Sequence, residues 1–142
     1  MYKRPARVLF WSWRDPCAGL LARAVAMQEG ASWLTARAGV WGEAPGCHAL
    51  ARFLRGRGLT PDGELEPLDG QLLAWADLLV TLDAQARSRC PPLASTTRPV
   101  HWPVPEAPGA YGQLYPRLRR RIGETIGGLR LLSRLDEGES GG

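Results

Sequence analysis

Short apolar runs alternate along this chain with segments in which apolar residues recur at helical spacing. The runs lack the polar alternation of half-exposed strands, so we interpret them as buried strands. Strands are predicted at residues 7–12, 32–41, 77–83 and 99–102. Helices are predicted at residues 17–30, 47–58, from Pro67 onward, and 111–132. The alternation predicts a single three-layer α/β domain with a four-stranded parallel sheet flanked by helices, in which the first strand is internal.

The length of 142 residues suits one domain with one hydrophobic core. We assign residues 1–135 to this domain and expect residues 136–142 to form a disordered tail. The apolar run at 8–13 is too short for the core of a signal peptide. No segment is long and apolar enough to span a membrane. We therefore expect a cytoplasmic protein without a membrane partner.

Cysteine and histidine content argues against metal and disulfide frameworks. The chain has three cysteines without a CxxC pair and two histidines, so we predict no disulfide scaffold, no metal site and no cofactor. The net charge of +4 is carried by seventeen arginines and Lys3. Four of these arginines, at positions 117 and 119–121, form a run on the last predicted helix, which we interpret as a solvated face. No recognition motif accompanies them, so a nucleic-acid partner is not expected.

The first strand-to-helix loop, at residues 12–18, is where chemistry is expected. In parallel α/β sheets, ligands bind at the carboxyl ends of the strands near the topological switch point. Asp77 and Asp83 flank the third predicted strand, and we interpret both as turn or capping residues rather than metal ligands.

Four segments, taken in order, carry a family resemblance. Residues 8–19 read Val-Leu-Phe-Trp-Ser-Trp-Arg-Asp-Pro-Cys-Ala-Gly and lead into a helix. Arg-Ala-Gly at 37–39, Ala-Asp-Leu-Leu-Val-Thr-Leu-Asp at 76–83 and Trp-Pro-Val-Pro-Glu-Ala at 102–107 follow. In this order and spacing, from about residue 7 to residue 132, the chain resembles the low-molecular-weight protein tyrosine phosphatases. That family includes one class of arsenate reductases.

The resemblance implies the phosphatase fold and a phosphate-binding loop of the pattern Cys-x5-Arg. In the family, the cysteine thiolate attacks phosphorus, the arginine clamps two phosphate oxygens, and an Asp on a distant loop protonates the leaving group. Here Ser12 stands at the nucleophile position and Ala18 at the arginine position. Glu106 stands at the general-acid position and is followed by Ala107 instead of proline.

Three further loop positions depart from the family pattern. Arg14 replaces a flexible glycine, and Asp15 replaces an asparagine and brings a charge that repels phosphate. Pro16 removes one backbone donor from the anion-binding loop. With Ser12 and Ala18, these changes predict that the nucleophile, the clamp and the anion field are lost together, so no catalytic residues are expected.

Cys17 lies beside the lost arginine, where some family members carry a second cysteine. We interpret it as a small packing residue at a helix start. The alternative is a nucleophile or a redox thiol.

Tryptophan is abundant, and we assign Trp11 and Trp75 to the core. The resemblance places Trp13, Trp41 and Trp102 near the phosphate loop, where they could line a pocket or a protein-binding patch. The candidate binding residues are Trp13, Arg14, Asp15, Trp41, Trp102 and Tyr111.

These observations favour a catalytically inactive phosphatase-like protein that binds a protein partner or a small ligand at the former active-site cleft. One alternative is a divergent phosphatase or arsenate-reductase-like enzyme that uses Cys17, with Arg14 as its anion ligand. A second alternative is a module that binds a neutral aromatic small molecule.

Overall fold

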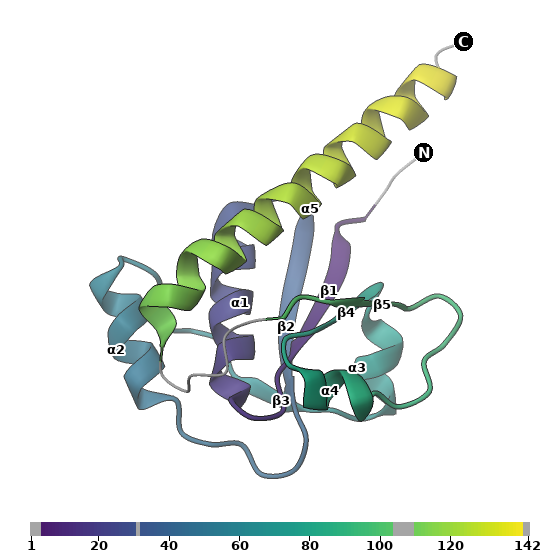
Figure 1. Cartoon of the computed structure of the whole chain (residues 1–142). Helices are drawn as coiled ribbons and strands as arrows, with labels where there is room; N and C mark the ends of the chain where they lie inside the picture. Colours follow the sequence, from purple (N-terminus) through teal and green to yellow (C-terminus); the bar gives the residue numbers. More distant parts are fainter. Residues whose placement is uncertain (1–3, 31, 104–109, 141–142) are drawn as a thin grey trace.

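Five parallel strands form one sheet in the order β3-β2-β1-β4-β5 (Figure 1). The structure is a computed structural model that describes residues 4–30, 32–103 and 110–140, with side chains as far as Leu131. The strands are β1 (Ala6–Trp11), β2 (Leu34–Val40), β3 (Leu65–Pro67), β4 (Leu78–Thr81) and β5 (Arg98–His101). The helices are α1 (Pro16–Gly30), α2 (His48–Gly56), α3 (Gly70–Trp75), α4 (Ala84–Ser88) and α5 (Tyr111–Ser140).

The sheet confirms the predicted α/β architecture. Strand β1 is central, pairs with β2 and β4 on its two sides, and leads into α1. Its side chains alternate between two apolar clusters. Val8 and Phe10 belong to the larger cluster, which includes residues of α1, α2 and α5. Leu9 and Trp11 belong to a second cluster with residues of α3 and α4. Because successive side chains of a strand point to opposite faces, these clusters cover the two faces of the sheet.

The prediction of four strands was wrong, because β3 adds a fifth. This strand has three residues, which pair with residues 38–40 of β2 at the sheet edge. Pro67, expected in a helix, ends this edge strand, where a missing N–H is tolerated. Helix α3 starts later, at Gly70, and the carboxylate of Asp69 caps it by accepting the Leu72 N–H at 2.8 Å. Pairing with β2, rather than local sequence pattern, makes this segment a strand.

Helix α5 continues to Ser140 and therefore includes residues 136–140, where a disordered tail was expected. Its apolar residues Leu114, Leu118, Ile122 and Ile126 are buried, and its first half lies along α1. The second half projects beyond the sheet (Figure 1). Residues 141–142 lie outside the described part of the chain.

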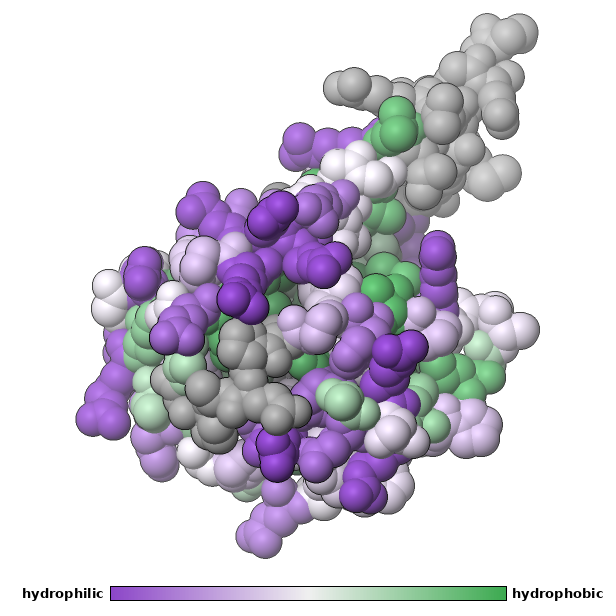
Figure 2. Space-filling view, viewed as in Figure 1, coloured by the Kyte–Doolittle hydropathy of each residue, from purple (hydrophilic) through white to green (hydrophobic). Residues whose placement is uncertain are grey.

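The surface is mostly hydrophilic on the face drawn in Figure 2, with scattered apolar residues. Among the described residues, the large apolar side chains that are exposed are Met27, Trp41 and Leu131, and Trp41 is the most exposed of them at 60%. No helix in the described ranges is long and apolar enough to cross a membrane.

Candidate functional site

The loop at residues 12–15 joins β1 to α1 at the carboxyl edge of the sheet. Pro16 is the first residue of α1, where its fixed φ suits a helix and its missing N–H costs nothing. The Ala18 N–H already donates to the Asp15 carbonyl at 2.9 Å. Cys17 and Ala18 therefore lie in the first helical turn, and both are buried. Neither side chain stands on an open loop.

The carboxylate of Asp83 binds this loop. Asp83 lies two residues after the end of β4. Its Oδ2 accepts hydrogen bonds from Ser12 Oγ at 3.1 Å, from the Trp13 N–H at 3.0 Å and from the Arg14 N–H at 2.8 Å. Its Oδ1 accepts the Ala86 N–H at 2.7 Å and so caps α4. Asp83 is only 5% exposed. One internal carboxylate thus holds two backbone donors of the loop and the Ser12 hydroxyl.

This arrangement has a direct chemical consequence for the loop. Buried carboxylates are stable only when they are well hydrogen-bonded, and Asp83 achieves this with the Ser12 hydroxyl and two backbone donors of the loop. The Ser12 hydroxyl is buried and donates to a carboxylate that also binds its neighbours. We expected Asp83 to be a capping residue, which is confirmed at α4. Its second role in the loop was missed, because no sequence spacing links residue 83 to residues 12–14.

The charge of Asp15 acts electrostatically on the hydroxyl of Tyr111. Burial, and then the negative charge of Asp15, raise the pKa of the Tyr111 hydroxyl above its ordinary value. Tyr111 is buried, with its ring 6.1 Å from that of Phe53. Asp15 on the loop thus acts electrostatically on Tyr111 at the start of α5. Glu106, the general-acid position, lies outside the described residues.

A disulfide joins Cys17 to Cys47, with the two Cα atoms 5.7 Å apart. The sequence did not indicate a disulfide scaffold, and this single bond was not predicted. Cys17 is in the first turn of α1, and Cys47 is the N-cap residue of α2. The pair is separated by 30 residues and has no motif spacing, so only the meeting of the two helix starts reveals it. Cys90 is a free thiol, and burial raises its pKa.

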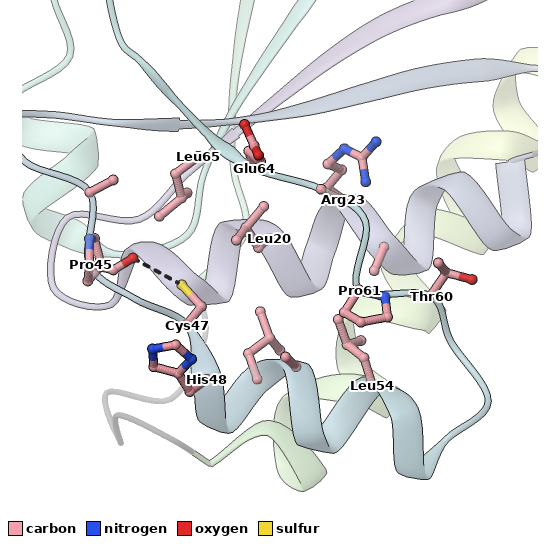
Figure 3. A pocket seen from close by; sticks show the side chains of 15 residues that line it. Leu20, Arg23, Pro45, Cys47, His48, Leu54, Thr60, Pro61, Glu64 and Leu65 are labelled. Carbon is pink, nitrogen blue, oxygen red and sulfur yellow. Dashed lines mark hydrogen bonds between the residues drawn. The ribbon is translucent and has the colours of Figure 1, made fainter.

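A pocket of about 400 Å³ opens between α1 and α2, with Cys47 in its wall (Figure 3). Apolar side chains from both helices line it, together with Arg23, His48 and Glu64. His48 lies beside Cys47 in this view, whereas Arg23 and Glu64 lie farther along the pocket. Among the described residues, no three His, Cys, Asp or Glu side chains form a group that could hold a metal ion.

Comparison with solved structures identifies the fold. A thioredoxin-dependent arsenate reductase from Corynebacterium glutamicum superposes with a TM-score of 0.72 at 17% identity, covering 92% of this chain and 65% of that one. YfkJ from Bacillus subtilis gives 0.71 at 17% identity, covering 92% and 98%. A protein tyrosine phosphatase gives 0.67 at 14% identity, covering 87% and 95%. This chain has the low-molecular-weight protein tyrosine phosphatase fold. No family model matches the sequence, and neither does any curated protein.

Within this phosphatase fold, the predicted aromatic residues separate. Trp13 packs edge-on against Trp11 at 6.3 Å, with the Arg89 guanidinium 4.2 Å from its ring, on the α3–α4 face of the sheet. Trp102 is buried on the opposite face, with its ring 5.8 Å from that of Phe10. Trp41 follows the end of β2 and is exposed. Trp13 and Trp102 thus lie on opposite faces of the sheet, and Trp41 alone of the three presents most of its surface to solvent.

Proposed function

We propose that this chain is a cytoplasmic, catalytically inactive protein with the phosphatase fold, which acts as a binding or regulatory module. The observation that carries the proposal is the Asp83 carboxylate, which engages the Trp13 and Arg14 N–H groups and the Ser12 hydroxyl. A phosphate in the loop would compete with this internal anion for the same donors and would be repelled by it.

The chemistry of the loop positions supports inactivity. The Ser12 hydroxyl donates to the Asp83 carboxylate, which already accepts the N–H groups of Trp13, Arg14 and Ala86. This carboxylate is therefore poorly placed to take the Ser12 proton, which leaves the hydroxyl a weak nucleophile. Ala18 is buried in α1 and offers no positive charge to clamp an anion. Asp15 adds a negative charge on the same loop, close enough to affect the ionisation of Tyr111.

A protein partner is the ligand that we propose for this edge of the sheet. Trp41 is 60% exposed at the carboxyl end of β2 and precedes an exposed loop at residues 42–46. Exposed tryptophan is a common anchor of protein interfaces. Trp13 and Trp102 lie on opposite faces of the sheet, so a pocket for a neutral aromatic ligand is not part of this proposal.

The disulfide favours a second candidate, a divergent enzyme of the arsenate-reductase kind that uses Cys17. The structural neighbours named arsenate reductases include one from C. glutamicum, which is described as thioredoxin-dependent, and one from Archaeoglobus fulgidus. Cys17 is paired with Cys47 here, which supports this candidate. Two features weigh against this candidate: position 18 is alanine where the family has arginine, and Asp15 adds a negative charge to the loop.

Turnover assays separate the two candidates. We expect the reduced, purified protein to hydrolyse an aryl phosphate at the buffer rate and to leave arsenate unreduced in the presence of dithiols. Cys17→Ser is the matched control, because it keeps the loop and removes the alternative nucleophile. Turnover that disappears in Cys17→Ser would contradict inactivity and establish the enzyme candidate. Turnover that survives in Cys17→Ser would contradict both.

A further inference from the structure

The N-termini of two helices meet at the Cys17–Cys47 disulfide. Cys17 is the second residue of α1, which has 15 residues, and Cys47 is the N-cap of α2, which has 9. A helix N-terminus carries a partial positive charge and favours a thiolate placed there. Both sulfurs would therefore be stabilised as the anions that form when the bond is reduced.

The two sulfurs differ in accessibility. Cys17 is 7% exposed and belongs to the main core cluster. Cys47 is half-buried, and its side chain lines the pocket between α1 and α2 (Figure 3). The pocket volume of about 400 Å³ leaves room for an attacking thiol on the Cys47 side. Exchange at a disulfide depends on which sulfur can be reached, so the geometry selects Cys47.

We propose that this disulfide is a redox-active centre that exchanges with dithiols through attack on Cys47. A reductant thiolate bonds to Cys47 Sγ, the bond to Cys17 Sγ breaks, and its electron pair leaves on Cys17, which takes a proton. The second thiol of the reductant then loses its proton and attacks the reductant sulfur that is bonded to Cys47. This closes the disulfide of the reductant and releases the Cys47 thiolate, which takes up the proton. The dithiol loses two electrons and becomes a disulfide, and the protein bond gains them.

Reduction of the disulfide also removes a covalent bond between the two helices that line the pocket. Leu20 and Ala24 of α1 form one wall, and Leu50 and Leu54 of α2 form another. The disulfide is the covalent link between the starts of these two helices. Reduction removes that covalent link between the two helices that line the pocket. This inference does not rest on catalytic inactivity.

Native-state reduction is the first arm of the test. The full chain is equilibrated with dithiothreitol without denaturant, alkylated, and mapped by mass spectrometry. We expect Cys17 and Cys47 to become labelled together at low millimolar dithiothreitol, while the oxidised protein labels at most at Cys90. A bond that stays intact until urea is added would overturn the proposal, and so would labelling of both cysteines after an oxidant such as diamide.

Direction of attack is the second arm. Oxidised glutathione is offered to the Cys17→Ser and Cys47→Ser variants, and Cys90, present in both, serves as an internal reference. We expect Cys47 in Cys17→Ser to form its mixed disulfide about tenfold faster than Cys90 and than Cys17 in Cys47→Ser. Equal rates, or a faster Cys17, would overturn the proposal. Aryl phosphate turnover is measured on the same samples, so a failure of the proposed function is seen separately.

Discussion

At the scale of single residues, one buried carboxylate determines the state of the loop. Asp83 satisfies three donors at residues 12–14 and one at the start of α4. The sequence made the changes at Ser12 and Ala18 visible, because a motif fixes those positions. It could not show that residue 83 fills the loop, since that contact depends on the pairing of β1 with β4.

Replacing Asp83 with asparagine measures this contact. Asn caps helices as well as Asp does, but its amide NH₂ must then face an N–H donor at one end. We expect Asp83→Asn to lower the free energy of unfolding by about 1–3 kcal/mol. Asp69→Asn is the matched control, because Asp69 caps α3 through a single hydrogen bond. Asp69→Asn should lower the free energy of unfolding by less than about 0.5 kcal/mol. Equal losses in urea denaturation would contradict the account.

Asp77 provides a pH-dependent contribution to stability. Its carboxylate accepts hydrogen bonds from Arg4 at 2.6 and 2.9 Å and from the Arg7 N–H at 2.9 Å. The Arg4 hydrogen bond is the main cause that lowers the pKa of Asp77, while burial opposes it. A lowered folded-state pKa stabilises the protein above the unfolded value of about 3.9, and this stability is lost as pH falls through the folded pKa.

We therefore expect wild-type stability to fall more steeply than that of Asp77→Asn as the pH is lowered from about 5 to below 4. Urea denaturation across this range measures the difference between the two proteins. Parallel stability curves would show that the Arg4–Asp77 pair contributes nothing that depends on pH.

At the scale of elements, local sequence pattern predicted most of the longer strands and helices. It missed the strand that forms only through pairing with a neighbouring strand. Strands β1, β2, β4 and β5 and helices α1 and α5 could be predicted, because continuous apolar runs and helical spacing are local signals. Strand β3 reads Leu-Glu-Pro and becomes a strand only through its pairing with β2. Residues 136–142 were expected to form a disordered tail because chain termini are often poorly ordered, whereas α5 runs to Ser140.

Glycine in α5 offers a test of this element. A Cβ at Gly123 would meet no atom within 4 Å, although Ile122 and Ile126 beside it are buried. We expect Gly123→Ala to raise the free energy of unfolding by about 0.5–1 kcal/mol, because alanine lowers the entropy cost of the helix. Gly30→Ala in α1 is the contrast, since its Cβ would collide with the Leu34 side chain. In thermal or urea unfolding, the free energy of unfolding should rise in Gly123→Ala and fall in Gly30→Ala. A loss of stability in Gly123→Ala would contradict the open surface at that position.

At the scale of the whole molecule, the topology brings the candidate site together. The carboxyl ends of β1, β2 and β4 place the loop at 12–15, Trp41 and Asp83 at one edge of the sheet. The alternation of strands and helices correctly predicted a parallel sheet with the loop at 12–15 at the carboxyl end of β1, whereas the role of this edge as a binding site stays a prediction. It did not predict the Cys17–Cys47 bond or the separation of Trp13 from Trp102, because both depend on which helix start or sheet face each residue reaches.

We propose that the loop no longer binds anions, so restoring only the nucleophilic sulfur at position 12 should not restore activity. The direct measurement is the initial rate of aryl phosphate hydrolysis by the reduced Ser12→Cys variant. A thiolate at position 12 would face the Asp83 carboxylate and the charge of Asp15 and would lack an arginine at Ala18. The account predicts hydrolysis at the buffer rate, and measurable anion binding only when Ala18→Arg and Asp15→Asn are added. Robust turnover by Ser12→Cys alone would show that the loop still holds phosphate and would contradict the account.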